Sequence, residues 1–390
     1  MRCALVSWVL LSACGRVGYD ELTERDAADD VDASADATTD ADDPDARLAL
    51  TCGTAVRVQD FGPAVVATFH GLDVAATTTG FVAVWSAGSN QIRSTGIAVS
   101  AGPSLQVIQP SFDVTGKQSA TLALSAIGDD LMLGVDDPDG PGIWLFALDE
   151  QGLIRATTKY IDTHRAYGHA FVTADAANDL FVVMGSDGSA TASFTRDHDI
   201  HPRSGPTAAF PIGTESAAAA LATGGYVLMT GNSSNCDVAR VDGVFAPLGT
   251  AQPIAMTCHN ASLVAAPGSP NVVAGWNCDN DAVWVTAGDP STTLPAYRAI
   301  AGDATDSASN PRLATTSAGV WYAYQVSGGR LGRTLLDASG AAVTNAEPAV
   351  VHTSAGIKAY DLAVHGDTAF LFWLESATNT ELWTMKLCAP

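Results

Sequence analysis

The residues best suited to chemistry in this 390-residue chain are its eight histidines, and four of them lie in two close pairs. His198 and His201 form a His-x-x-His pair, and His164 and His169 lie upstream. Between the pairs lies an apolar hairpin, residues 171–184, followed by a third strand, which places the pairs at opposite edges of one sheet. The four histidines therefore do not form one metal site. Since cysteines in tight zinc spacings are also lacking, we predict no metal and no cofactor.

Carboxylates cluster in two short segments that each follow an apolar strand. Their oxygens suit Ca²⁺, but Asp, Asn, Pro and Gly are also the residues that tight turns select, and we favour the turn interpretation. Both segments are predicted on one face of the fold, together with two histidines that precede strands. The candidate binding residues on this face are Asp136, Asp137, Asp139, His169, His259, Asp279, Asn280 and Asp281.

Sequence motifs for catalysis are lacking. The chain contains no Gly-x-Ser-x-Gly, no His-Glu-x-x-His and no phosphate-binding Gly-Lys-Ser/Thr loop. The segment from Asp139 to Trp144 only vaguely echoes the Asp box of sialidases, with the wrong spacing. We therefore predict no catalytic residue and favour a non-enzymatic protein. The alternative is a polysaccharide hydrolase or lyase, which would need two carboxylates converging at one site.

The elements that position these residues repeat along the chain. Each repeat has an alternating strand, a turn, and a strongly apolar strand, and the first residues recur every 42 to 50 residues. A period of roughly 40 to 50 residues is that of a four-stranded propeller blade. The sequence therefore predicts an all-β, seven-bladed β-propeller. The seven strand pairs are 74–85, 122–135, 171–184, 221–230, 263–276, 313–324 and 362–373.

The end of the chain leaves the seventh blade one strand short. Residues 48–69, ahead of the first repeat, have the missing length and include a strand-like segment at 54–58. Pairing that segment with residues 383–387 would close the ring and remove the free sheet edges. We therefore predict a propeller over residues 47–390, closed by an N-terminal strand that completes the last blade.

Seven cysteines are present, and the closure model predicts how some of them pair. Cys52 at the start of the closing strand should meet Cys388 at the end of its partner. Among the other three in the propeller, we prefer a bridge between Cys258 and Cys278 with Cys236 left as a thiol; pairing of Cys236 with Cys258 is the main rival. The six aromatic residues Trp85, Trp144, Trp276, Trp284, Trp373 and Trp383 recur with the repeats, so we expect them to fill gaps between blades.

The N-terminus has the pattern of an export signal. One arginine precedes an apolar run, and the run ends in Leu11-Ser12-Ala13-Cys14. This resembles the lipobox of bacterial lipoproteins. The resemblance implies a signal peptide at 1–13 and a lipid on Cys14, an acyl anchor of the palmitate type. In Gram-negative lipoproteins an Asp after that cysteine favours the inner membrane; Gly15 here implies the outer membrane, facing either the periplasm or the surface.

Residues 14–46 are predicted to be a disordered linker. Between Asp20 and Asp45 there are 12 carboxylates and one arginine, which is too much like charge and too little apolar surface for a core. The whole chain has a formal net charge of −23, so nucleic acid is excluded as an expected partner. We expect a monomer that is anchored in the membrane by lipid and binds an unidentified protein or glycan without catalysis.

Overall fold

The computed structural model describes residues 48–389 with gaps at 63–68, 88–90, 101–103, 116–121, 137–141, 161–168, 187–190, 204–206, 209–214, 232–234, 256, 279–281, 302–307, 344–348, 354–355 and 377–378. The described residues form seven antiparallel sheets. The predicted signal peptide and linker lie outside them. Within the described ranges, no helix is long and apolar enough to cross a bilayer.

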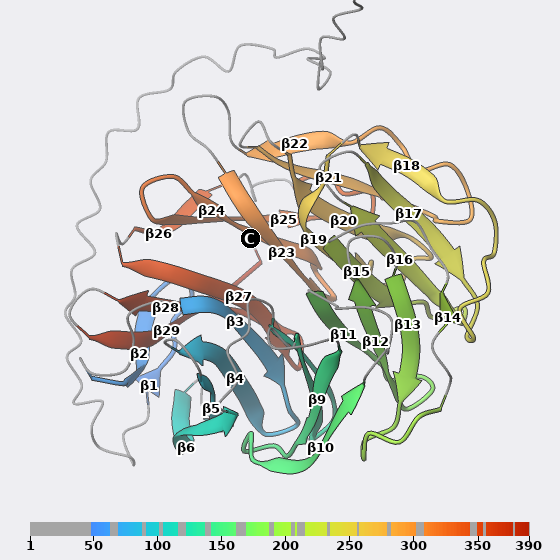
Figure 1. Cartoon of the computed structure of the whole chain (residues 1–390). Coiled ribbons are helices and arrows are strands. Elements are labelled where there is room, and N and C mark those ends of the chain that lie inside the picture. Colours follow the sequence, from blue (N-terminus) through green and yellow to red (C-terminus); the bar gives the residue numbers. More distant parts are fainter. Residues whose placement is uncertain are drawn as a thin grey trace, which may run out of the picture. The chain divides into compact units, whose positions relative to one another are not determined.

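Each sheet is one blade of four consecutive strands, except at the seam where the ring closes. The innermost strands contact one another in sequence around the disc, and the fourth strands lie at its rim (Figure 1). This arrangement confirms the all-β, seven-bladed prediction. The strands of blades 1 to 3 are β3 (Phe69–Ala76), β4 (Gly80–Ala87), β5 (Gln91–Ser100) and β6 (Ser104–Thr115); β7 (Leu122–Ile127), β8 (Asp130–Asp136), β9 (Ile143–Leu148) and β10 (Ile154–Tyr160); β11 (His169–Asp175), β12 (Leu180–Ser186), β13 (Thr191–Arg196) and β14 (Thr207–Ala208).

Blades 4 to 6 continue the same order. Their strands are β15 (Glu215–Ala220), β16 (Tyr226–Gly231), β17 (Cys236–Val241) and β18 (Gln252–Ala255); β19 (His259–Ala265), β20 (Val272–Asn277), β21 (Val283–Gly288) and β22 (Arg298–Ala301); β23 (Ala308–Thr316), β24 (Gly319–Val326), β25 (Arg330–Leu336) and β26 (Ala349–Thr353).

Blade 7 is completed from the other end of the chain. Its strands β27 (Ile357–His365), β28 (Thr368–Ser376) and β29 (Thr380–Leu387) are followed at the rim by β2 (Ala55–Asp60), with Ala55 opposite Met385 and Arg57 opposite Trp383. A guanidinium nitrogen of Arg57 lies 3.0 Å from a carboxylate oxygen of Glu381. The preceding short strand β1 (Leu48–Ala49) pairs instead with β6 of blade 1. The N-terminal segment therefore joins the first and last blades.

The disulfide predicted at this closure is present. Cys52 and Cys388 are bonded, and their Cα atoms are 5.7 Å apart. On the other side of the seam, the ring of Phe61 packs against Trp85 of blade 1 with centroids 4.6 Å apart. Covalent, hydrogen-bonded and apolar contacts thus meet at one seam.

The hydrophobic core is divided into seven clusters, one in each seam between neighbouring blades. The reason is the alternation of side chains along a strand, which sends successive residues of one strand into two different seams. In β4, Phe81 and Trp85 pack against blade 7, whereas Val82 and Val84 pack against blade 2. Trp85, Trp276 and Trp373 are fully buried in these clusters, as expected from their recurrence.

Blade 4 corrects one sequence interpretation. Its inner strand was expected to begin at Leu221, but β15 ends at Ala220 and Leu221 lies in the turn to β16. The strand reads Glu-Ser-Ala-Ala-Ala-Ala, and alanine does not mark a strand by its own propensity. Packing between two neighbouring inner strands determines its conformation.

Candidate functional site

Three of the eight predicted binding residues lie in described strands, at the edge of the sheets where second strands end and first strands begin. Asp136 ends β8, and His169 and His259 begin β11 and β19. His259 is half-buried and opposite Asn277. The other five candidates, Asp137, Asp139, Asp279, Asn280 and Asp281, lie outside the described residues. We call this edge, where first strands begin and second strands end, the loop face. The opposite edge, where first strands end and second strands begin, is the turn face.

On the turn face, polar side chains link neighbouring blades. Asp129 of blade 2 accepts hydrogen bonds from the amide (2.9 Å) and hydroxyl (2.5 Å) of Thr78 in blade 1. Asp367 of blade 7 accepts the corresponding pair from the amide and hydroxyl of Ser317 in blade 6. A ring nitrogen of His365 lies 3.3 Å from the carbonyl oxygen of Thr78, across the closing seam. These groups hold the fold together.

A recurring aspartate shapes the turn between the third and fourth strands of five blades. In the turn that begins at Asp337, one carboxylate oxygen accepts the amides of Ser339 (2.8 Å) and Ala341 (2.9 Å), and Gly340 has a left-handed φ of 74°. Burial alone would raise the pKa of Asp337, but hydrogen bonds from Ser339 and Ala341 outweigh it and lower the pKa. The sequence reasoning missed this pattern, although its spacing of about one blade could have revealed it. The five aspartates are Asp149, Asp197, Asp242, Asp289 and Asp337.

Near the axis, two carboxyl groups from the innermost strands converge. Asp73 in β3 and Asp361 in β27 are hydrogen-bonded to each other, and Arg312 of β23 approaches Asp361 with nitrogen and oxygen 3.6 Å apart. Asp73 also accepts the amide of Leu124 in blade 2, and Asp361 accepts that of Val74 in blade 1, both at 2.8 Å. Sequence reasoning missed this pair, because its members are 288 positions apart.

The electrostatics of this pair follow from burial. Loss of water and then the charge of Asp361 raise the pKa of Asp73 well above its ordinary value. Burial likewise raises the pKa of Asp361, although Arg312 and the hydrogen bond from Asp73 oppose the shift. Both shifts favour one shared proton on the pair at the pH where an isolated aspartate is ionised, and the two groups titrate together. The paired groups hold three inner strands together across two seams.

The two loop histidines behave differently. The side chain of His201 is 73% exposed, whereas that of His198 is only 21% exposed and lies between two carboxylates. His198 lies on the turn face of blade 3 and His169 begins the inner strand at its loop face, so the two lie at opposite edges, as predicted. Among the described residues, no group of three or more His, Cys, Asp or Glu is arranged to hold a metal ion.

The remaining cysteines correct a predicted bridge. Cys236, Cys258 and Cys278 are buried and hold thiols, so the expected Cys258–Cys278 disulfide is not formed. The sulfur of Cys278 lies 3.5 Å from the carbonyl oxygen of Thr257. The sulfur of Cys258 instead packs over Gly231, where an added Cβ would come within 2.7 Å of it.

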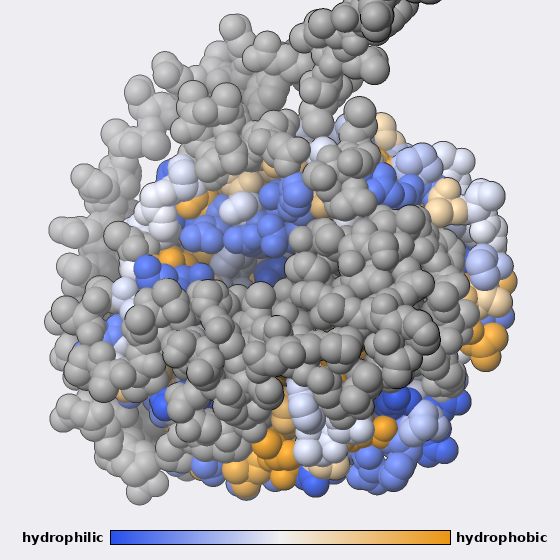
Figure 2. Space-filling model, in the orientation of Figure 1, coloured by the Kyte–Doolittle hydropathy of each residue, from blue (hydrophilic) through white to orange (hydrophobic). Residues whose placement is uncertain are grey.

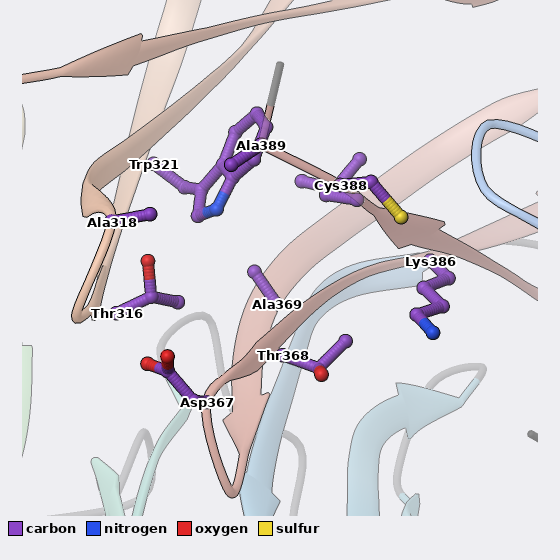
Figure 3. A pocket seen from close by; sticks show the side chains of 10 residues that line it. Thr316, Ala318, Trp321, Asp367, Thr368, Ala369, Lys386, Cys388 and Ala389 are labelled. Atoms are coloured by element: carbon purple, nitrogen blue, oxygen red, sulfur yellow. The ribbon is translucent and has the colours of Figure 1, made fainter.

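One recess lies between the strand turns of blades 6 and 7 on the turn face. Trp321, Asp367, Thr368 and Lys386 are among the side chains around it, next to Cys388 (Figure 3). Its volume of about 270 Å³ is just below the range of typical ligand pockets, and it is open to solvent. We therefore do not assign a ligand to it.

Comparison with known proteins supports the fold alone. No family model and no curated protein matches the chain. The WD40 domain of Toxoplasma gondii coronin is similar with a TM-score of 0.55 and 10% identity, over 89% of this chain and 90% of that one. The propeller of Myceliophthora thermophila Cps50 gives 0.53 and 11%, over 85% and 98%. The chain has a β-propeller fold. At such low sequence identity, the structural similarity shows the fold and gives no information on the activity or ligand of this chain.

Proposed function

We propose that the protein is a lipid-anchored protein of the bacterial outer membrane whose propeller binds a protein or glycan without catalysis. The observation that best supports a location outside the cytoplasm is the Cys52–Cys388 disulfide at the ring closure. Disulfides persist in oxidising compartments, and export through a signal ending at Cys14 would deliver the chain to one. Residues 14–46 would then separate the lipid from the propeller.

Binding without catalysis is supported by the way the carboxylates are used. A glycosidase needs two carboxyl groups roughly 5 to 9.5 Å apart with substrate between them. Asp73 and Asp361 instead bond directly to each other and to the backbones of neighbouring blades. Among the described residues, this pair of converging carboxyl groups near the axis is thus engaged in holding inner strands.

The loop face is the proposed binding surface. On the turn face, the side chains of Asp129, Asp367 and His198 already bond to neighbouring elements. The loop face carries Asp136, His169 and His259, and β20, which precedes Asp279 and Asp281 in the sequence, ends at this face. On the face drawn in Figure 2, described residues near the middle of the disc are mostly hydrophilic, which suits a polar ligand.

A glycan array and cross-linking to outer-membrane proteins test this proposal with the full-length protein. The double variant Asp279→Asn with Asp281→Asn should weaken binding about tenfold, as for loss of one or two polar contacts of about 1 kcal/mol each. The control Asp199→Asn, an exposed residue of the turn face, should bind like the wild type. An equal loss of binding affinity in the double variant and in the control would show that the ligand binds outside the loop face. Release of reducing ends from a bound polysaccharide would show an enzyme instead.

A further inference from the structure

The side chain of His198 joins two blades through both of its ring nitrogens. Nδ1 lies 2.7 Å from a carboxylate oxygen of Asp130, the first residue of β8 in blade 2. Nε2 lies 2.8 Å from a carboxylate oxygen of Asp179, in the turn before β12 in blade 3. The ring edge of Phe181 packs beneath it, with centroids 5.7 Å apart. His198 is therefore held in place from three directions.

This geometry favours a ring that is protonated on both nitrogens. An ionised carboxylate only accepts hydrogen bonds, so each ring nitrogen must carry a hydrogen to bond its partner. A neutral imidazole has one N–H and would turn the lone pair of its other nitrogen toward a carboxylate oxygen. The arrangement with both bonds therefore requires the imidazolium cation.

The surrounding charges balance when His198 is protonated. Arg155 of β10 lies 2.5 Å from the second oxygen of Asp130, so two cations alternate with two anions in the order Arg155, Asp130, His198, Asp179. In the histidine's own turn, Asp197 is bonded to the amides of Asp199 and His201 and to Arg203. Burial by itself would lower the pKa of His198, but the bonds to Asp179 and Asp130 outweigh it and raise the pKa.

We propose that His198 is a proton-dependent latch between blades 2 and 3, closed when the imidazolium bridges Asp130 and Asp179 and opened by deprotonation. The bond that opens is the one to Asp179. Asp130 is also held by Arg155, so it stays beside Nδ1–H, whereas the side chain of Asp179 is 74% exposed and can turn into water. Asp179 also has a left-handed φ of 57°, a conformation that its contacts must stabilise.

The direction of the pH dependence follows from the raised pKa. The latch contributes its full stability below the pKa of an unfolded histidine, about 6.5. That contribution is lost as pH rises through the higher pKa of the folded state. A protein on a cell envelope meets external pH directly, so the latch would loosen the turn face of blades 2 and 3 under alkaline conditions.

Long-range ¹H–¹⁵N spectra of the histidine rings in the full-length protein test this latch. The signal of His198 is assigned by its loss in His198→Gln. We expect both nitrogens of His198 to be protonated below the titration midpoint, and the midpoint to shift to lower pH in Asp179→Asn. Since Asp179 is exposed, that variant should fold even if His198→Gln does not.

The matched control is His201→Gln, three residues away on the same turn, which should leave the His198 midpoint unchanged. A neutral His198 ring at acidic pH would overturn the proposal. Equal titration midpoints of His198 in the wild type and in Asp179→Asn would overturn it as well.

Discussion

At the scale of single residues, buried carboxyl groups in this protein act as structural donors and acceptors. Asp361 is 7% exposed and ties β27 to blade 1, and Asp73 ties β3 to blade 2. Their positions could not be predicted from sequence, because each partner is a backbone amide in another blade. The hydrophobic periodicity that reveals a strand carries no information about such a cross-blade bond.

The mutation Asp73→Asn tests the shared proton. The folded-state pKa of Asp73 is raised, so its contribution to stability is present at low pH and is lost as pH rises through that pKa. Asparagine can still donate to Asp361 and accept from Leu124, but it cannot ionise. As pH rises from below the ordinary Asp pKa through the raised pKa of Asp73, we expect the melting temperature of the variant to fall less than that of the wild type. Parallel melting profiles for the two proteins would contradict a protonated Asp73.

The companion variant Asp361→Asn separates charge from shape. It removes the anion that faces Arg312 while keeping the side chain's size. Leaving the partly exposed guanidinium of Arg312 and the backbone amide of Val74 with a weaker partner should cost about 1 to 3 kcal/mol across the pH range. Chemical denaturation at several pH values measures this cost, and an unchanged stability would show that the contact between Asp361 and Arg312 contributes little.

At the scale of elements, hairpins with alternating strands and Gly or Asp turns were predictable, and blade 4 was not. Its alanine-rich β15 has no apolar alternation strong enough to mark a strand, so the prediction began at the next apolar residue. The aspartate turns were also missed, because a lone Asp after an apolar strand reads as an ordinary loop residue. Only the repeated hydrogen bonds identify them as one motif: all five aspartates accept the amide two residues ahead, and Asp149, Asp197, Asp242 and Asp337 also accept the amide four residues ahead.

The mutation Asp337→Ala tests the aspartate turn. Removing the carboxylate leaves the amides of Ser339 and Ala341 without their acceptor, which should cost about 1 kcal/mol after allowing for solvent at the turn. Because the pKa of Asp337 is lowered, the wild-type contribution is present above the ordinary Asp pKa and is lost as pH falls through the lowered one. The stability difference from wild type should therefore vanish in acid. Asp199→Ala, in another such turn but not its capping residue, should cost less than about 0.5 kcal/mol by urea denaturation.

At the scale of the whole molecule, the closure was predictable because counting repeats left the last blade one strand short. The finer arrangement was not, since β1 pairs with blade 1 while β2 pairs with blade 7. The candidate binding face was predicted only as a set of loop ends. Loops are less constrained by periodicity than strands, so sequence could not assign their side chains a ligand.

Deleting residues 48–60 tests the closure. It removes β1, β2 and the Cys52–Cys388 bridge, and should destabilise the propeller by several kcal/mol. Deleting the chain only up to residue 45 should cost almost nothing. The double variant Cys52→Ser with Cys388→Ser removes the disulfide but keeps both strands. Its melting temperature should lie between those of the two truncations. Equal melting temperatures for both truncations would contradict a closing role for the segment.

We propose that this scaffold is attached to a membrane through one sulfur atom, that of Cys14. Leu11, Ser12 and Ala13 precede it as in a lipobox, and two or three acyl chains anchor a protein durably, at about 0.8 kcal/mol per buried methylene. The most direct measurement is cell fractionation of wild type and Cys14→Ser in a Gram-negative host, with mass spectrometry of the N-terminal peptide. We predict an acylated wild type that partitions with the outer membrane and a Cys14→Ser protein in the soluble fraction. An unmodified wild-type peptide, with both proteins in the same fraction, would contradict the account.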